Sequence, residues 1–405
     1  MNPSLLHVLR LWERRILVLL IYALPLHEAS KNVFWGLLVA LGLARCFMER
    51  QWPGTGRVGW GALAWLAAGI WSSCFAIEPS ASWKGLWDMA RGAVLLWVMG
   101  SIASAKPGQP GGEDCRVLFL KHLILSACLA SVVAFWDYGW AIYNRPPLAP
   151  VIHLQLRSVG HFNQSAIYLA MAWILTLAAV LDQQVFARRR ICMAAFAMIG
   201  LALLGTTSRS AIAVAGLVGF LIMLNSRPPR WLIGFCLVAA LFVMAGLVSS
   251  ASLRSRVLFQ GSFRNRVTLW QSACAAVQTR WWTGVGLNNF KNISLKKEDP
   301  LSFGTVDHAH SLYFNTLAQL GLPGSVALLA LLAASGGTIW KCRPAAGGRR
   351  LWFYGAGGGW LIVVLVGFSN ATIHHEISML FFILLGMMIQ VEKSMSCSAR
   401  VRVSC

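Results

Sequence analysis

Long apolar runs separated by short polar stretches recur along the whole chain, and this pattern constrains the fold more than any other feature. A helix that spans a bilayer needs about 20 mostly apolar residues. With 57% hydrophobic and 12% charged residues among 405, the chain is too apolar for an ordinary soluble protein. We therefore expect an all-α polytopic membrane protein, with one transmembrane domain over residues 1–405 and about 12 transmembrane helices. The apolar segments lie near residues 16–28, 33–48, 57–76, 84–104, 116–140, 164–183, 190–207, 209–225, 231–250, 311–340, 351–369 and 376–391.

The basic residues follow the positive-inside rule except in one loop. With the N-terminus inside, 21 of the 35 Lys and Arg residues fall in stretches expected to be cytoplasmic, and the C-terminus is cytoplasmic too. The exception is the long loop at 251–310, between the ninth and tenth segments, which carries eight Lys and Arg against three acidic residues. These cations form a solvated surface, contact anionic lipid headgroups, or bind a phosphate-bearing ligand.

Arg209 separates two apolar runs so tightly that we expect its guanidinium at or just below the outer interface. It lies within Gly205-Thr206-Thr207-Ser208-Arg209-Ser210. An arginine held near hydrocarbon is costly unless it is paired, hydrated or able to snorkel. The functional alternative to snorkelling is that the guanidinium holds phosphate oxygens in a bidentate manner.

The basic loop itself predicts an amphipathic helix along the membrane surface, followed by a glycine-rich turn. Helical spacing places Arg266 and Trp270 on one face, and Arg264 precedes them. By periodicity alone Trp270 is a packing residue. Gly284 and Gly286 are interpreted as turn residues, because no Lys-Ser/Thr pair accompanies them as in a phosphate-binding loop.

Two histidines, His308 and His310, follow this loop just before the tenth segment. A His-x-His pair can bind a metal, but only Asp307 lies nearby as a further ligand, so we expect no metal site. A histidine at the start of a helix beside a basic cavity also meets the requirements of a general base. The ordinary alternative is a polar group satisfied by hydrogen bonds.

A fourth polar segment leads from a Pro-rich outer loop into the sixth apolar segment. It contains Arg157, His161 and Asn163. These polar groups are candidates for lining the same cavity, whereas Asn163 also suits the cap of the following helix.

In this order the segments resemble the bacterial O-antigen ligase and polymerase superfamily, and within it the lipopolysaccharide O-antigen ligases most closely. The resemblance covers roughly the C-terminal three-fifths of the chain, and its motifs are weak singly but fairly specific as an ordered set. They are Gly160 to Asn163, Thr207-Ser208-Arg209, Arg266 with Trp270, Gly284 to Phe290, and His308-x-His310 followed by a Gly321-Leu322-Pro323-Gly324 turn. The chain departs from the pattern at Ser311, where the family often has Asn, which leaves the hydrogen-bonding partner of the histidine open.

The resemblance implies a GT-C-type membrane glycosyltransferase in the inner membrane of a Gram-negative bacterium, with a periplasmic active site and no metal or other cofactor. It implies an undecaprenyl-diphosphate-linked glycan as donor and the lipid A core as acceptor. By the family's motifs, His310 corresponds to the essential histidine, and Arg209 and Arg266 to the essential arginines.

The residue chemistry agrees with these roles. His310 would take the proton of the acceptor hydroxyl, and the two arginines would stabilise the departing diphosphate. One-step displacement would invert the anomeric centre. The candidates for binding diphosphate or glycan are Arg157, His161, Asn163, Arg264, His308 and Trp270.

Three other functions stay open at this point. An O-antigen polymerase would share the donor and the cationic cavity but use a second lipid-linked glycan as acceptor. A protein O-oligosaccharyltransferase would use a Ser or Thr hydroxyl. A transporter of an anionic lipid would more often show internal repeats, which we do not find. The expected partners are the lipid-linked donor, the lipid A core and membrane lipids, without nucleic acid, and the expected state is a monomer.

Overall fold

The structure is a computed structural model of the chain and consists of helices joined by turns and loops over the residues that it describes. These are residues 3–50, 54–102, 115–144, 152–182, 188–226, 230–234, 261–293, 306–343 and 350–403, with 185, 186, 228 and 236. The helices are α1 (Pro3–Leu26), α2 (Glu28–Glu49), α3 (Gly56–Cys74), α4 (Pro79–Ser101), α5 (Cys115–Tyr143), α6 (Phe162–Asp182), α7 (Arg189–Gly205), α8 (Arg209–Ser226), α11 (Gly261–Arg280), the short η1 (Phe290–Asn292), α12 (Leu312–Lys341), α13 (Leu351–Val366) and α14 (His375–Val403).

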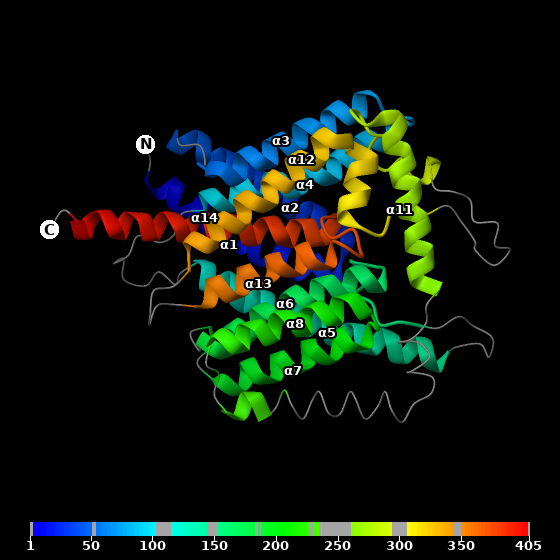
Figure 1. Cartoon of the computed structure of the whole chain (residues 1–405). Helices are drawn as coiled ribbons and strands as arrows, with labels where there is room; N and C mark the ends of the chain where they lie inside the picture. Colours follow the sequence, from blue (N-terminus) through cyan, green and yellow to red (C-terminus); the bar gives the residue numbers. More distant parts are fainter. Residues whose placement is uncertain are drawn as a thin grey trace.

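Most of these helices run side by side in one bundle, and α11 crosses the end of that bundle (Figure 1). The chain begins and ends at the opposite end from α11. Within the bundle α14 packs on α4, α12 on α3, α13 on α6 and α1 on α2. Helices α6 and α14 are the most enclosed of the six long apolar helices. In their most apolar 18-residue stretches 83% and 89% of the residues are buried, as expected for helices that are apolar on every side.

Six of the described helices are long and apolar enough to cross a membrane, namely α2, α5, α6, α8, α12 and α14. The chain is therefore an all-helical, polytopic membrane protein, as the sequence predicts. Eleven of the twelve predicted apolar segments coincide with described helices. The remaining segment, 231–250, lies mostly outside the described residues, so the count of about twelve stays a prediction.

Two segments differ from their expected form. Helix α1 begins at Pro3 rather than near residue 16. Its charged first half stays helical because buried Glu13 accepts a hydrogen bond from Arg45 of α2 at 2.9 Å. The segment 311–340 forms α12 but is interrupted at Gly321, whose φ of 67° is not helical.

The basic loop forms a helix, α11, as predicted, and a small apolar cluster fixes it to the bundle, whereas its position along the membrane surface stays a prediction. The cluster consists of Leu269, Ala273, Phe290, Ala309 and Ala318, from α11, η1, the loop before α12 and α12 itself. It is separate from the main core. This contact brings the Arg266 face of α11 next to the loop that carries His308 and His310.

Candidate active site

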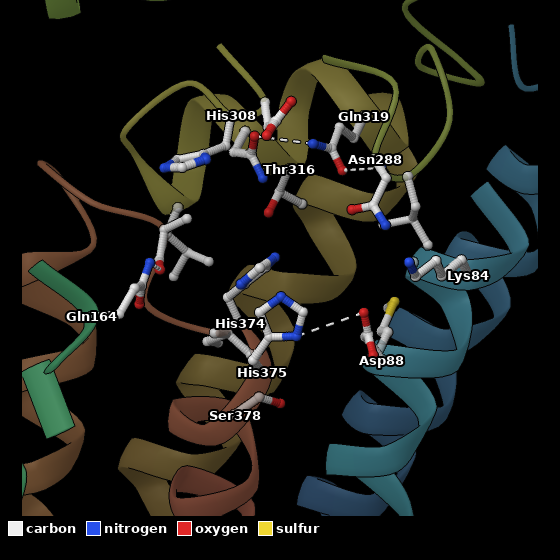
Figure 2. A pocket seen from close by; sticks show the side chains of 18 of the residues that line it. Lys84, Asp88, Gln164, Asn288, His308, Thr316, Gln319, His374, His375 and Ser378 are labelled. Carbon is white, nitrogen blue, oxygen red and sulfur yellow. Dashed lines mark hydrogen bonds and ion pairs between the residues drawn. The ribbon is translucent and has the colours of Figure 1, made fainter. Parts of the chain in front are cut away.

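A cavity of about 780 Å³ opens at the end of the bundle that α11 crosses. It lies between α4, α12 and α14 and is completed by the loops before α6 and α12 and by the turn after α11 (Figure 2). Its volume is within the range of sites that bind small molecules or parts of larger ones.

The interruption of α12 shapes one side of this cavity. At Gly321 the helix frees the carbonyls of Ala318 and Gln319, which accept hydrogen bonds from Val285 N at 2.9 Å and Gly286 N at 3.0 Å. A Cβ on Gly284 would lie 2.3 Å from the carbonyl oxygen of Gln319, and Gly284 has a φ of +66°. Two backbones therefore cross in close contact here. The interpretation of Gly284 as a turn residue is confirmed.

A chain of amide groups connects this turn to the histidine loop. The Asn288 N–H donates to Gln319 Oε1 at 3.1 Å, and Gln319 Nε2 donates to Asn315 Oδ1 at 3.1 Å. The same Asn315 oxygen accepts from the Ala309 N–H at 3.2 Å, between the two histidines of the motif. Asn315, one helical turn beyond Ser311, thus supports the backbone between the two histidines. Ser311 itself donates to the carbonyl of Gly367 at 3.2 Å.

Five histidines line the cavity: His161, His308, His310, His374 and His375. Burial, followed by the neighbouring His308, Arg266 and His161, lowers the pKa of His310 to about 3. Burial and then His374 lower the pKa of His308 to about 4. At neutral pH both imidazoles are uncharged and able to accept a proton.

The backbone around the cavity is strained at several positions. His310, Asn288 and His375 line it with positive φ values of 48°, 55° and 41°, and Thr207, beside Ser208, has a φ of 57°. Residues other than glycine rarely adopt this conformation, and such positions often cluster at functional sites.

Two arginines lie next to the histidine side of the cavity. Burial and the nearby Arg209 lower the pKa of Arg266, and Arg266 in turn lowers the pKa of His310, so the three groups interact electrostatically. Ser208, which precedes Arg209, donates to Asn163 Oδ1 at 2.8 Å. An anion between the two guanidiniums would relieve their mutual repulsion.

The middle of the chain matches a family model. Residues 193–329 match the model described as O-antigen ligase, and this stretch contains Arg209, Arg266 and His310. Over these residues the chain is similar to the O-antigen ligase family. Members of this family are glycosyl-transferring enzymes. No curated protein matches the chain.

The structure brings together most of the residues that the O-antigen ligase motifs single out. His161, Asn163, His308 and His310 line the cavity. Arg266 lies near His310, and Arg209 lies near Arg266.

Three other candidate residues are placed differently. Trp270 stacks on Phe314 of α12, with ring centroids 5.2 Å apart, which fits its interpretation as a packing residue. Arg157 makes a bidentate ion pair with Asp137, with both hydrogen bonds 2.7 Å long, and is not among the residues that line the cavity. The side chain of Arg264 lies outside the described part of the structure.

Sequence reasoning missed one wall of the cavity. Lys84 and Asp88 of α4 and the pair His374 and His375 at the start of α14 all line it. A signal was present, because ionisable residues within apolar segments usually face the interior of a bundle or a polar cavity. Among the described residues, no group of three or more His, Cys, Asp and Glu side chains could hold a metal ion.

Proposed function

We propose that this protein is a lipopolysaccharide O-antigen ligase, which transfers a glycan from an undecaprenyl diphosphate carrier to the lipid A core on the periplasmic face of the inner membrane. The observation that carries the proposal is that Arg266 lies near both Arg209 and the cavity-lining His310, with all three residues inside the matched segment. A diphosphate leaving group requires cations, and an acceptor hydroxyl requires a base. Both are present at the same end of the bundle.

The proposed chemistry is one displacement at the anomeric carbon. The acceptor oxygen forms the new glycosidic bond as its proton passes to His310, and the bond to the diphosphate oxygen breaks. Arg209 and Arg266 stabilise the charge on the departing diphosphate, the kind of electrostatic stabilisation that dominates many enzymes. We expect inversion of the anomeric configuration, and a product with retained configuration would contradict this step.

Binding of the donor should also raise the pKa of His310. The low pKa of His310 makes its imidazole a weak proton acceptor. A diphosphate held by Arg266 would place negative charge nearby and raise that pKa. His310 would therefore become a stronger base only when the donor is in place.

Topology supports a periplasmic site. The starts of α5 and α7 and the end of α12, which carry described basic residues expected to be cytoplasmic, lie toward the end of the bundle opposite α11 (Figure 1). The Arg189 guanidinium lies 4.2 Å from the Trp231 ring centroid and that of Arg343 lies 5.1 Å from the Trp340 centroid. Arginine and tryptophan together are typical of a membrane interface. With that end in the cytoplasm, the cavity faces the periplasm.

The test is the lipopolysaccharide of a strain in which the gene is deleted. Free lipid A core with accumulated carrier-linked polymer supports the ligase. Core that carries a single repeat unit indicates instead an O-antigen polymerase and refutes the proposal. Complementation with the unaltered gene should restore ligation, whereas a His310→Ala variant present in the membrane at the same level should not. Full ligation by that variant would rule out His310 as the base.

A further inference from the structure

The cavity has two walls that differ in chemistry. Lys84 and Asp88, one helical turn apart on α4, lie on the side opposite His308 and Gln164, and His374 and His375 lie between them (Figure 2). Asn288, from the turn after α11, lies above Lys84 on the same side. We call Lys84, Asp88, Asn288 and His375 the α4 wall.

A buried network holds the α4 wall in place. Asp88 Oδ1 accepts a hydrogen bond from Arg91 at 2.5 Å, and Arg91 donates also to Asn32 Oδ1 of α2 at 2.6 Å. The second Asp88 oxygen lies 3.7 Å from Nδ1 of His375. Both carboxylate oxygens are therefore oriented, although Asp88 keeps 18% of its side-chain surface exposed.

The start of α14, which carries His375, is anchored independently. Glu376 pairs with Lys31 of α2, and both side chains are buried, at 5% and 2% exposure. Burial of two charges is favourable only when they are well paired, so this contact fixes α2 against α14. His375 remains 45% exposed beside it.

Lys84 differs from the other charged residues of this network. It is exposed and lines the cavity, and among the described residues it has no carboxylate within ion-pairing distance. Lys291, by contrast, is paired with Glu78 at 3.3 Å. The ammonium group of Lys84 thus has three donors available to a ligand.

Charge sorts the two substrates between the walls. The diphosphate of the donor is attracted to Arg209 and Arg266, two guanidiniums that repel each other, whereas on the α4 wall Asp88 offsets the charge of Arg91 and leaves only Lys84 as a cation. In a single displacement the acceptor oxygen approaches the anomeric carbon from the side opposite the leaving group. The acceptor sugar therefore belongs on the side of the cavity away from the arginines.

Resting on the proposed function, we propose that the α4 wall is the binding site for the acceptor sugar. Its groups suit vicinal hydroxyls, because Asp88 offers oriented acceptor oxygens while Lys84 and the Asn288 amide offer donors. His375 adds a ring nitrogen on the same side. Except for Asn288, the residues of the α4 wall lie outside residues 193–329, the segment that matches the family model.

The test is a two-substrate kinetic analysis of the purified full-length protein in lipid nanodiscs, with an undecaprenyl-diphosphate-linked oligosaccharide as donor and lipid A core as acceptor. Asp88→Asn and Lys84→Met are each expected to raise the KM for the acceptor about tenfold or more, the usual effect of losing a charged hydrogen bond, with the KM for the donor unchanged. Glu392→Gln is the matched control. Glu392 pairs with Lys341 at 3.0 Å, at the other end of α12, and its loss should change neither KM.

The outcomes separate this inference from the proposed function. Lack of transfer by the unaltered protein would overturn the proposed function itself. Transfer by the unaltered protein, with a raised donor KM or with no KM change in either variant, would overturn the assignment of the α4 wall. Lys84→Met keeps the test decisive if Asp88→Asn does not fold, because Lys84 is exposed and takes no part in the buried network.

Discussion

The amide chain beneath the histidine loop predicts that Gln319 positions His310. Gln319 is 5% exposed and bonds through both ends of its side chain, to the Asn288 N–H and to Asn315 Oδ1. Gln319→Leu removes the acceptor of the partly buried Asn288 N–H and the donor to Asn315, and each hydrogen bond contributes about 0.5–1.5 kcal/mol. We therefore expect a loss of about 1–3 kcal/mol in the free energy of unfolding.

The same change should impair catalysis beyond its effect on stability. Asn315, without Gln319, no longer holds the backbone between His308 and His310 in its strained form. A base displaced by about 1 Å can cost about 100-fold in rate. We expect kcat to fall by at least about tenfold. The KM for the donor should stay unchanged, because Arg209 and Arg266, which are proposed to bind the donor, are not part of the hydrogen-bonded amide groups of Asn288, Gln319 and Asn315.

The assay compares thermal unfolding and initial transfer rates of the purified variant with those of Gln390→Leu. Gln390 is also 5% exposed and donates to the carbonyls of Met99 and Ile102, at the end of α4 far from the cavity. Both variants should lose stability, and only Gln319→Leu should lose kcat. A normal kcat for Gln319→Leu, or an equal loss of kcat in Gln390→Leu, would refute the positioning role.

Four further predictions concern charge and backbone geometry. Arg266→Met should lower kcat/KM about 100- to 1000-fold, as does the removal of hydrogen-bond donors to the transition state in other enzymes. Steady-state rates, measured with equal amounts of each protein in the membrane, test this, and an unchanged kcat/KM would contradict it. Because the pKa of His310 in the free enzyme is about 3, kcat/KM should stay level from about pH 8 to about pH 5, and an acid limb near pH 6.5 would contradict this. Since His308 and His310 bind protons less readily when folded, the free energy of unfolding should fall as pH drops below about 6.5, which melting curves across pH can check. Gly284→Ala should reduce thermal stability strongly, because its Cβ would lie 2.3 Å from the Gln319 carbonyl oxygen.

Local pattern was sufficient for the membrane character and for part of the site. A long run of apolar residues indicates a helix surrounded by lipid or protein, whichever helices it packs against. Eleven predicted segments therefore coincide with described helices. Arg209, Arg266 and His310 were identifiable because each lies in a short motif whose residue types suit diphosphate transfer. The turn at Gly284 was identifiable for the same reason, since a glycine pair without a following Lys-Ser/Thr indicates backbone geometry rather than phosphate binding.

The composition of the cavity was decided only by the tertiary structure. Asp88 of α4 and His375 of α14 are nearly 290 positions apart in the chain, yet Asp88 Oδ2 and His375 Nδ1 lie 3.7 Å apart. Periodicity shows that a helix has a polar face, but not which helix that face meets. The contact between Asn289 and Glu78 likewise joins residues 211 positions apart. The sequence by itself determined that this chain is a membrane protein with a cationic segment followed by a histidine pair, because those properties belong to single segments. Helix packing determined which histidines, carboxylates and amides share one cavity, because that depends on the mutual fit of many side chains.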